Sequence, residues 1–139
     1  MQAKNQNTSI TFHLADITGT LPAGLAAQGF DAIICTEVIE HVFSPRNLVR
    51  NAFELLKPGG QMLIMTPYHS YVKNLAMAIM GRMDQHFTVL WDYGHIKFWS
   101  KETLSLILQE AGFRQLRFSG VGRIPVLWKS MVFRCKRPQ

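Results

Sequence analysis

The sequence is short of cysteines, acidic residues and long apolar runs. Its 139 residues include two cysteines, Cys35 and Cys135, and both lie in apolar stretches typical of strands. Buried reduced thiols are therefore expected in place of a disulfide framework. The first ten residues are polar and contain no signal-peptide core, and the longest helix-like apolar stretch, near 76–80, is too short for a transmembrane segment. These absences predict a soluble, cytoplasmic chain.

The shortage of acidic residues is concentrated at the C-terminal end. The formal net charge is +6, and no acidic residue follows Glu110. The cations of this basic tail are Arg114, Arg117, Arg123, Lys129, Arg134, Lys136 and Arg137. Such a tail either contacts an anionic partner, such as nucleic acid, acidic lipid or a phosphorylated substrate, or forms a solvated basic surface.

The composition and the apolar patterns predict one globular domain over residues 1–139. With 47% hydrophobic and 17% charged residues, the chain is long enough for one core and too short for two. Strands are predicted at 10–17, 30–36 and 61–66, and an antiparallel pair at 113–120 and 126–136. The continuous apolar run of 30–36 favours a strand covered on both faces, as in a parallel sheet. The predicted class is α/β, with a mostly parallel sheet and an antiparallel edge pair.

Three helices are predicted between these strands. Ser44 and Pro45 mark the start of one that runs to Leu56, and Ser100 is the expected cap of another that Gly112 ends. Residues 72–83 have apolar residues at helical spacing, which favours a core-facing helix; the alternative is a methionine-rich lid over an apolar substrate. The connection at 84–95 is long, and long connections are often functional.

Four segments in a fixed order point to a known family. They are FDAIICTEVIEHV (30–42), LLKPGG (55–60), GHIKFWS (94–100) and LILQEAGF (106–113). This order resembles the class I S-adenosylmethionine-dependent methyltransferases, and most closely the group around the ubiquinone-biosynthesis O-methyltransferases. The resemblance implies the C-terminal part of a Rossmann-like methyltransferase fold, S-adenosylmethionine as cofactor, and methyl transfer to the hydroxyl of a small molecule or of RNA.

One part of the family's pattern has no counterpart in this sequence. The family begins with a strand, a glycine-rich turn and a second strand ending in an acidic residue, and such a turn brings backbone amides close to the ligand at a helix N-terminus. The chain is therefore expected to be truncated and inactive alone.

Without those strands, segment 30–36 would have an unpaired edge. The predicted outcomes are a homodimer through that edge, pairing of 10–17 against it, or a fragment of a longer protein. The alternative function is a non-catalytic module that binds or dimerises with a partner chain.

The resemblance also implies four cofactor-binding residues. Asp16 corresponds to the acidic residue that accepts a hydrogen bond from the adenine amine, and Ile17 would offer its backbone N–H to the ring. Thr36 and Glu37 lie where the family holds the methionine end of the cofactor. For Asp16 the alternative is a turn-forming aspartate at a strand end.

A divalent metal site is the second expectation. Glu37, Glu40 and His41 stand at i, i+3 and i+4, so a helix would place them on one face. Together with His95 they resemble the metal-holding segments of small-RNA 2′-O-methyltransferases. A set with two imidazoles suits manganese, cobalt, iron or zinc better than magnesium. Alternatively, Glu37 bonds the cofactor while Glu40 and His41 cap the following helix.

Aromatic and histidine residues gather after the 61–66 segment, where the family builds its acceptor site. They are Tyr68, His69, Tyr71, His86, Trp91 and Tyr93. These rings either stack on an aromatic acceptor or form a satellite hydrophobic cluster under a long loop.

Overall fold

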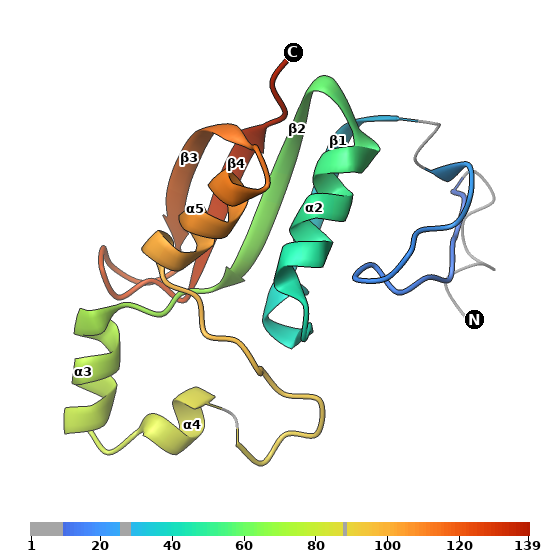
Figure 1. Ribbon diagram of the computed structural model, residues 1–139. Coiled ribbons are helices and arrows are strands. Elements are labelled where there is room, and N and C mark those ends of the chain that lie inside the picture. Colours follow the sequence, from blue (N-terminus) through green and yellow to red (C-terminus); the bar gives the residue numbers. More distant parts are fainter. Residues whose placement is uncertain (1–9, 26–28, 88) are drawn as a thin grey trace.

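A four-stranded sheet forms the centre of the computed structural model, which describes residues 10–25, 29–87 and 89–139 (Figure 1). In the order β1-β2-β4-β3, the strands are β1 (Phe30–Thr36), β2 (Leu56–Pro67), β4 (Ser130–Lys136) and β3 (Arg114–Val121). β1 and β2 are parallel, whereas β2–β4 and β3–β4 are antiparallel. The α/β class and the final antiparallel pair are confirmed.

The expectation of a mostly parallel sheet is wrong, because one of the three strand pairs is parallel. The segment predicted as a strand at 10–17 joins no sheet among the described residues. A strand is stable only when a neighbour satisfies its backbone groups, and no described segment pairs with these residues.

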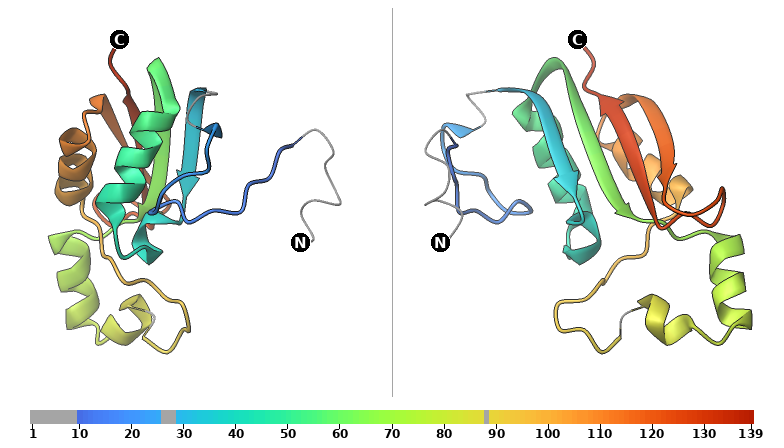
Figure 2. Two further views of the ribbon diagram at one scale, coloured as in Figure 1. Left: turned by 45° about the vertical axis from the view of Figure 1, so that its right-hand side comes forward. Right: turned by 180° about the vertical axis from the view of Figure 1, so that it is seen from behind.

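Helices α2 (Pro45–Leu55) and α5 (Lys101–Glu110) pack on one face of the sheet (Figures 1 and 2). Both predicted helix starts are confirmed, although Ser44 makes no side-chain cap bond. Ser100 caps α5 through a reciprocal capping box with Thr103. A short 3-10 turn, η2 (Ile39–His41), precedes α2.

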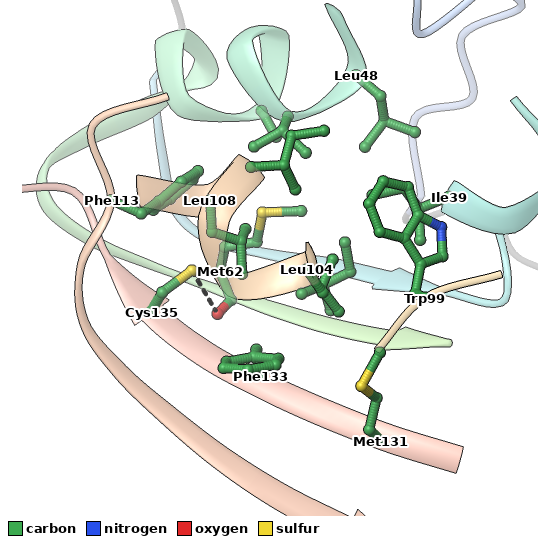
Figure 3. Packing of buried hydrophobic residues seen from close by; sticks show 14 of the residues in the cluster. Ile39, Leu48, Met62, Trp99, Leu104, Leu108, Phe113, Met131, Phe133 and Cys135 are labelled. Atoms are coloured by element: carbon green, nitrogen blue, oxygen red, sulfur yellow. Dashed lines mark hydrogen bonds between the residues drawn. The ribbon is translucent and has the colours of Figure 1, made fainter. Parts of the chain in front are cut away.

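The hydrophobic core lies between these two helices and the sheet (Figure 3). Most of its members come from the inward positions of β2 and β4 and from the apolar stripes of α2 and α5, and Phe113 comes from the connection between α5 and β3. They include Leu48, Met62, Ile64, Leu104, Leu108, Phe113, Met131, Phe133 and Cys135. Both cysteines are free thiols, with Cys135 buried and Cys35 half-buried.

The opposite face of the sheet carries no helix among the described residues, as the view from behind shows (Figure 2). Ala32, Ile34 and Thr36 of β1 point to this face and are exposed, Ile34 by 73%. The expectation that 30–36 is covered on both faces is therefore wrong. β1 has β2 as its partner, and 10–17 does not pair with it. The homodimer and the fragment stay predictions.

Segment 71–87 forms two helices in place of the one predicted at 72–83. They are α3 (Tyr71–Ile79) and α4 (Met83–Phe87), and Gly81 between them has φ of 64°, a left-handed value that ends a helix. The core-facing interpretation is wrong, because Leu75 and Ile79 are exposed and the buried residue of α3 is Lys73. Among the described residues, no helix has the length and hydrophobicity needed to span a bilayer.

Candidate functional site

The candidate site lies at the edge where the parallel strands β1 and β2 end. Parallel neighbours bring their carboxyl ends to the same edge, which is where α/β folds bind ligands. Thr36 lies opposite Met65, and the amide of Glu37 donates to the Met65 carbonyl at 2.9 Å. Glu37 has φ of 53°, a left-handed value uncommon outside glycine. This residue turns the chain sharply from β1 into η2.

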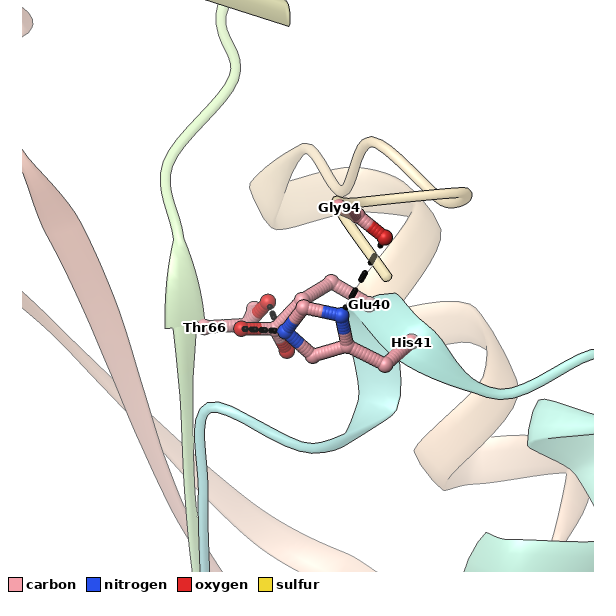
Figure 4. A network of polar contacts seen from close by, with 4 residues as sticks. All are labelled: Glu40, His41, Thr66 and Gly94. Carbon is pink, nitrogen blue, oxygen red and sulfur yellow. Dashed lines mark hydrogen bonds and ion pairs between the residues drawn. The ribbon is translucent and has the colours of Figure 1, made fainter. Parts of the chain in front are cut away.

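Glu40 is the most deeply buried charged side chain of the site, with 1% of its surface exposed. Its Oε2 accepts a hydrogen bond from the Thr66 hydroxyl at 2.9 Å (Figure 4). Its Oε1 has no hydrogen-bond partner in the part of the chain that the structure describes. A buried carboxylate oxygen without a partner lowers the stability of the fold. A bound cation or a hydrogen-bond donor at this atom would remove that penalty.

His41 is oriented by the segment that follows α4. Its Nδ1 lies 3.2 Å from the carbonyl oxygen of Gly94, a distance at which Nδ1–H donates to that oxygen (Figure 4). The lone pair of the neutral ring is then on Nε2, which lies 3.9 Å from Glu40 Oε1. Metal-binding histidines are commonly held in this way, by a second hydrogen bond to a backbone carbonyl.

His95 completes a group of three. The backbone amides of Ile96 and Lys97 both donate to the Glu40 carbonyl, at 2.9 and 3.0 Å, and this fixes the position of the 95–97 segment. The rings of His95 and His41 are 5.0 Å apart, edge to face. One ligand atom each from Glu40, His41 and His95 lies within 4.8 Å of the other two. Burial and the neighbouring His41 lower the pKa of His95, which favours the neutral form that binds metals.

Glu37 lies beside this group and not within it. Burial and, next, the charge of Glu40 raise the pKa of Glu37. The structure thus brings together three of the four predicted metal ligands and places the fourth next to them. The prediction of one shared helical face is wrong, because Glu37 is left-handed and η2 begins after it.

The four predicted cofactor residues do not line one cavity. The cavity that reaches Glu37 is not lined by Asp16, Ile17 or Thr36. Asp16 Oδ1 accepts from both the amide and the hydroxyl of Thr18 at 2.8 Å, and these bonds lower the pKa of Asp16. This geometry matches the turn-forming alternative. The Ile17 carbonyl accepts a hydrogen bond from the Asn51 amide at 2.8 Å, which ties the turn to α2.

A cavity of about 600 Å³ lies beside the site. His69, His86 and Trp91 of the predicted acceptor cluster line it, together with Glu37 and His95. The other members lie elsewhere: Tyr71 and Tyr93 are exposed, and Tyr68 packs against Phe118 and Trp128 in the core.

Three residues that contact or line the candidate site were not predicted from the sequence. Thr66 and Gly94 orient Glu40 and His41 through contacts over long sequence separations, for which the sequence carries no local signal. Lys73 lines the cavity from a segment that was predicted, from its apolar residues, as a core-facing helix or a methionine-rich lid. A lysine within an otherwise apolar helical stretch was the available signal.

Comparison with known proteins identifies the family. The family model described as "Methyltransferase domain" matches residues 2–117. The ubiquinone biosynthesis O-methyltransferase of Cereibacter sphaeroides (strain ATCC 17023) is 34% identical over 119 residues, which cover 81% of this chain and 47% of that protein. That of Ruegeria pomeroyi is 30% identical over 105 residues, which cover 75% and 42%. The chain spans about half the length of the curated relatives it matches.

Solved structures agree with the fold. An O-methyltransferase family protein from Burkholderia thailandensis aligns over 99% of this chain and 39% of its own, with a TM-score of 0.67 and 15% identity. The N-methyltransferase NodS from Bradyrhizobium japonicum, in complex with S-adenosyl-L-homocysteine, aligns over 99% and 59%, with a TM-score of 0.62 and 18% identity. The chain belongs to the methyltransferase-domain family of class I S-adenosylmethionine-dependent methyltransferases.

Proposed function

We propose that this chain forms the acceptor side of an S-adenosylmethionine-dependent O-methyltransferase that acts on the hydroxyl of a small molecule. Glu40, His41 and His95 would hold a divalent metal ion, with Glu37 beside them. The observation that carries the proposal is the buried Oε1 of Glu40, which has no hydrogen-bond partner among the described residues and lies 3.9 Å from His41 Nε2. The O-methyltransferase names of the relatives support the choice of a hydroxyl acceptor.

The chain's own residues divide the work at this site. A divalent ion bound there would supply Lewis acidity, which lowers the pKa of an acceptor hydroxyl. Thr66 holds Glu40 and Gly94 holds His41, so the ligand atoms are positioned in advance. Glu37, with its raised pKa, is suited to accept the hydroxyl proton at a carboxylate oxygen. Two imidazoles and a carboxylate favour manganese, cobalt, iron or zinc over magnesium.

The cofactor of this reaction would be S-adenosylmethionine. Thr36 and Glu37 would form the wall near its methionine end, and Asp16 with Ile17 the wall near adenine once the 16–18 turn rearranges. The described residues contain no glycine-rich turn that opens a helix. We therefore propose that residues from outside this chain complete the cofactor pocket, and that the chain alone does not catalyse methyl transfer.

Metal titration tests the proposal most directly. Calorimetry with manganese chloride should show one ion per chain, and Glu40→Gln should weaken binding by about 10- to 100-fold. Glu110→Gln is the matched control, because Glu110 pairs with Arg46 on the surface far along the chain. His95→Gln is a second test if Glu40→Gln fails to fold. Equal manganese binding by the wild type and both site variants contradicts the metal site.

Titration of S-adenosylhomocysteine separates the cofactor from the metal. Added to the chain with and without manganese, it should bind weakly, because the described residues supply only part of a pocket. Tight one-to-one binding by the chain alone would contradict the proposal that outside residues complete the pocket.

A second candidate function is a non-catalytic module that pairs with a partner chain. In the part of the chain that the structure describes, β1 has an unpaired edge and an exposed Ile34, and unpaired apolar strand edges favour further pairing. Light scattering should then show a dimer that Ile34→Lys converts to a monomer. A monomeric wild type contradicts homodimerisation. RNA as an acceptor stays a prediction from the family resemblance.

A further inference from the structure

The cavity beside the candidate metal site is strongly cationic. It is reached from the end of β2, from α3 and α4, and from the connection between β3 and β4. Lys73, Arg82, Arg123 and Lys129 line it against a single carboxyl group, that of Glu37. In the part of the chain that the structure describes, none of these four cations forms a salt bridge with a carboxylate.

Lys73 is the least expected of these cations, because its side chain is buried. Only 6% of its surface is exposed, and its Nζ donates one hydrogen bond, at 2.6 Å, to the Tyr68 carbonyl. An ammonium group has three donors, so two remain for a ligand. Burial and the charge of Arg123 lower the pKa of Lys73 to about 8. A buried cation without a counterion is costly, and an anion in the cavity would relieve that cost.

His69 adds a buried polar atom without a partner. The residue is 5% exposed, lines the cavity, and its Nδ1 has no hydrogen-bond partner among the described residues. Its ring is held by His86 and Phe98, with centroids 4.5 and 5.0 Å away. Burial and the charges of His86 and Lys73 lower the pKa of His69 to about 4, so the ring is neutral at pH 7. A neutral imidazole with Nδ1 protonated donates one hydrogen bond to an oxyanion.

We propose that the methyl acceptor carries an anionic group, a carboxylate or a phosphate, that binds in this cavity to Lys73, Arg123 and His69. The proposal rests on the proposed function, because it names the acceptor of the same site. His95 and Glu37 line the same cavity, so the hydroxyl and the anionic group would share one space. Cavities of this volume hold compact small molecules. A phenol with an anionic substituent fits this description.

The cofactor itself offers a second source of the same chemistry, because its methionine end carries a carboxylate. The two sources differ in which ligand should respond to loss of a cavity cation. An acceptor site predicts that Arg123→Gln weakens an anionic acceptor and leaves S-adenosylhomocysteine unaffected. A cofactor site predicts the reverse. Arg123 is suited to this test because its side chain is exposed at the cavity and its loss does not disturb the core.

The experiment compares three probes on the full chain at one ionic strength. Catechol, catechol-4-carboxylate and catechol-4-phosphate are titrated with manganese present, and binding is followed by calorimetry and by the NMR shifts of the histidine rings. The anionic probes should bind about tenfold tighter than catechol. Arg123→Gln should remove most of that difference. Lys136→Gln, which removes a cation on β4 that does not line the cavity, should leave it unchanged.

The outcomes separate this inference from the function beneath it. Equal affinity of the wild type for all three probes overturns the anionic acceptor, and so does an equal loss in Arg123→Gln and Lys136→Gln. Weakened S-adenosylhomocysteine with unchanged anionic probes assigns the cavity to the cofactor and also overturns it. Absence of manganese binding would end the proposed metal site, yet the tenfold preference for the anionic probes would still be measured.

Discussion

The two faces of the sheet differ sharply in how they are covered. On one face, Ile64 of β2 and Phe133 of β4 are sealed beneath α2 and α5. On the other face, Ile34 of β1 is 73% exposed, and no described helix lies over it (Figure 2). Yet the apolar runs of β1 and β2 do not alternate with polar residues as one-sided strands usually do.

This difference shows that the outward positions of β1 and β2 have a sequence pattern typical of buried residues, although the described residues leave that face exposed. A strand with one face in water normally places polar residues at every second position. Here Ala32, Ile34, Leu63 and Met65 occupy the outward positions of β1 and β2. Their pattern is the one expected of a sheet covered on both sides. The open face is therefore the part of the fold whose stability depends on what else contacts the chain.

Truncating a matched pair of isoleucines should give the largest contrast between the faces. Ile64→Ala on the covered face leaves a cavity in the core and should lower the free energy of unfolding by about 2–5 kcal/mol. Ile34→Ala on the open face removes an exposed side chain and should cost about 0.5 kcal/mol or less. Urea denaturation of the two variants measures both values. Similar losses for the two would mean that the open face is covered in solution.

Much of the covered half of the fold is predictable because its signals are local. The cap at Ser100 is set by residues within one turn, and the strands β2 and β4 by short apolar runs. The prediction of a strand at 10–17 was wrong, because a strand forms only when a neighbouring strand pairs with its backbone. The apolar stripe of 72–83 predicted helical structure correctly, but it did not indicate whether that stripe would be buried against another part of the chain.

The candidate site was predictable only in part, for a similar reason. Glu40 and His41 were predicted from their spacing and His95 from the resemblance to known metal-holding segments, and the structure brings the three together. Thr66 and Lys73 were missed, because their roles depend on contacts that only the folded chain creates.

The cavity beyond the end of β2, which His69 lines, should also respond to pH where the open face does not. His69 is buried beside Phe98, and its pKa is lowered to about 4 from 6.5. The unfolded chain binds a proton at this residue below pH 6.5, whereas the folded chain does so only below about 4. Stability that is present above pH 6.5 is therefore lost as the pH falls to 4. After allowance for solvent screening, the loss is about 1–2 kcal/mol.

The measurement is the free energy of unfolding at several pH values for the wild type and for His69→Gln. The variant keeps the other titrating groups, so subtracting its profile isolates His69. Its profile should be flatter between pH 6.5 and 4. Parallel profiles for the two proteins would show that His69 is protonated as easily in the folded chain as in water.

The smallest expected effect sharpens the comparison on the open face itself. Arg117 and Arg134 lie directly opposite each other on β3 and β4, and both are exposed there. Like charges in such a cross-strand pair repel, so Arg117→Glu should stabilise the sheet by about 0.5 kcal/mol. The reciprocal change Arg134→Glu should do the same, and the double variant should lose the gain because two carboxylates then face each other.

Added salt should reduce the stability differences of all three variants, since the charges are in water. Urea denaturation at low and high salt measures them. A gain that persists at high salt would mean that this pair is shielded from solvent, and that the face is not open.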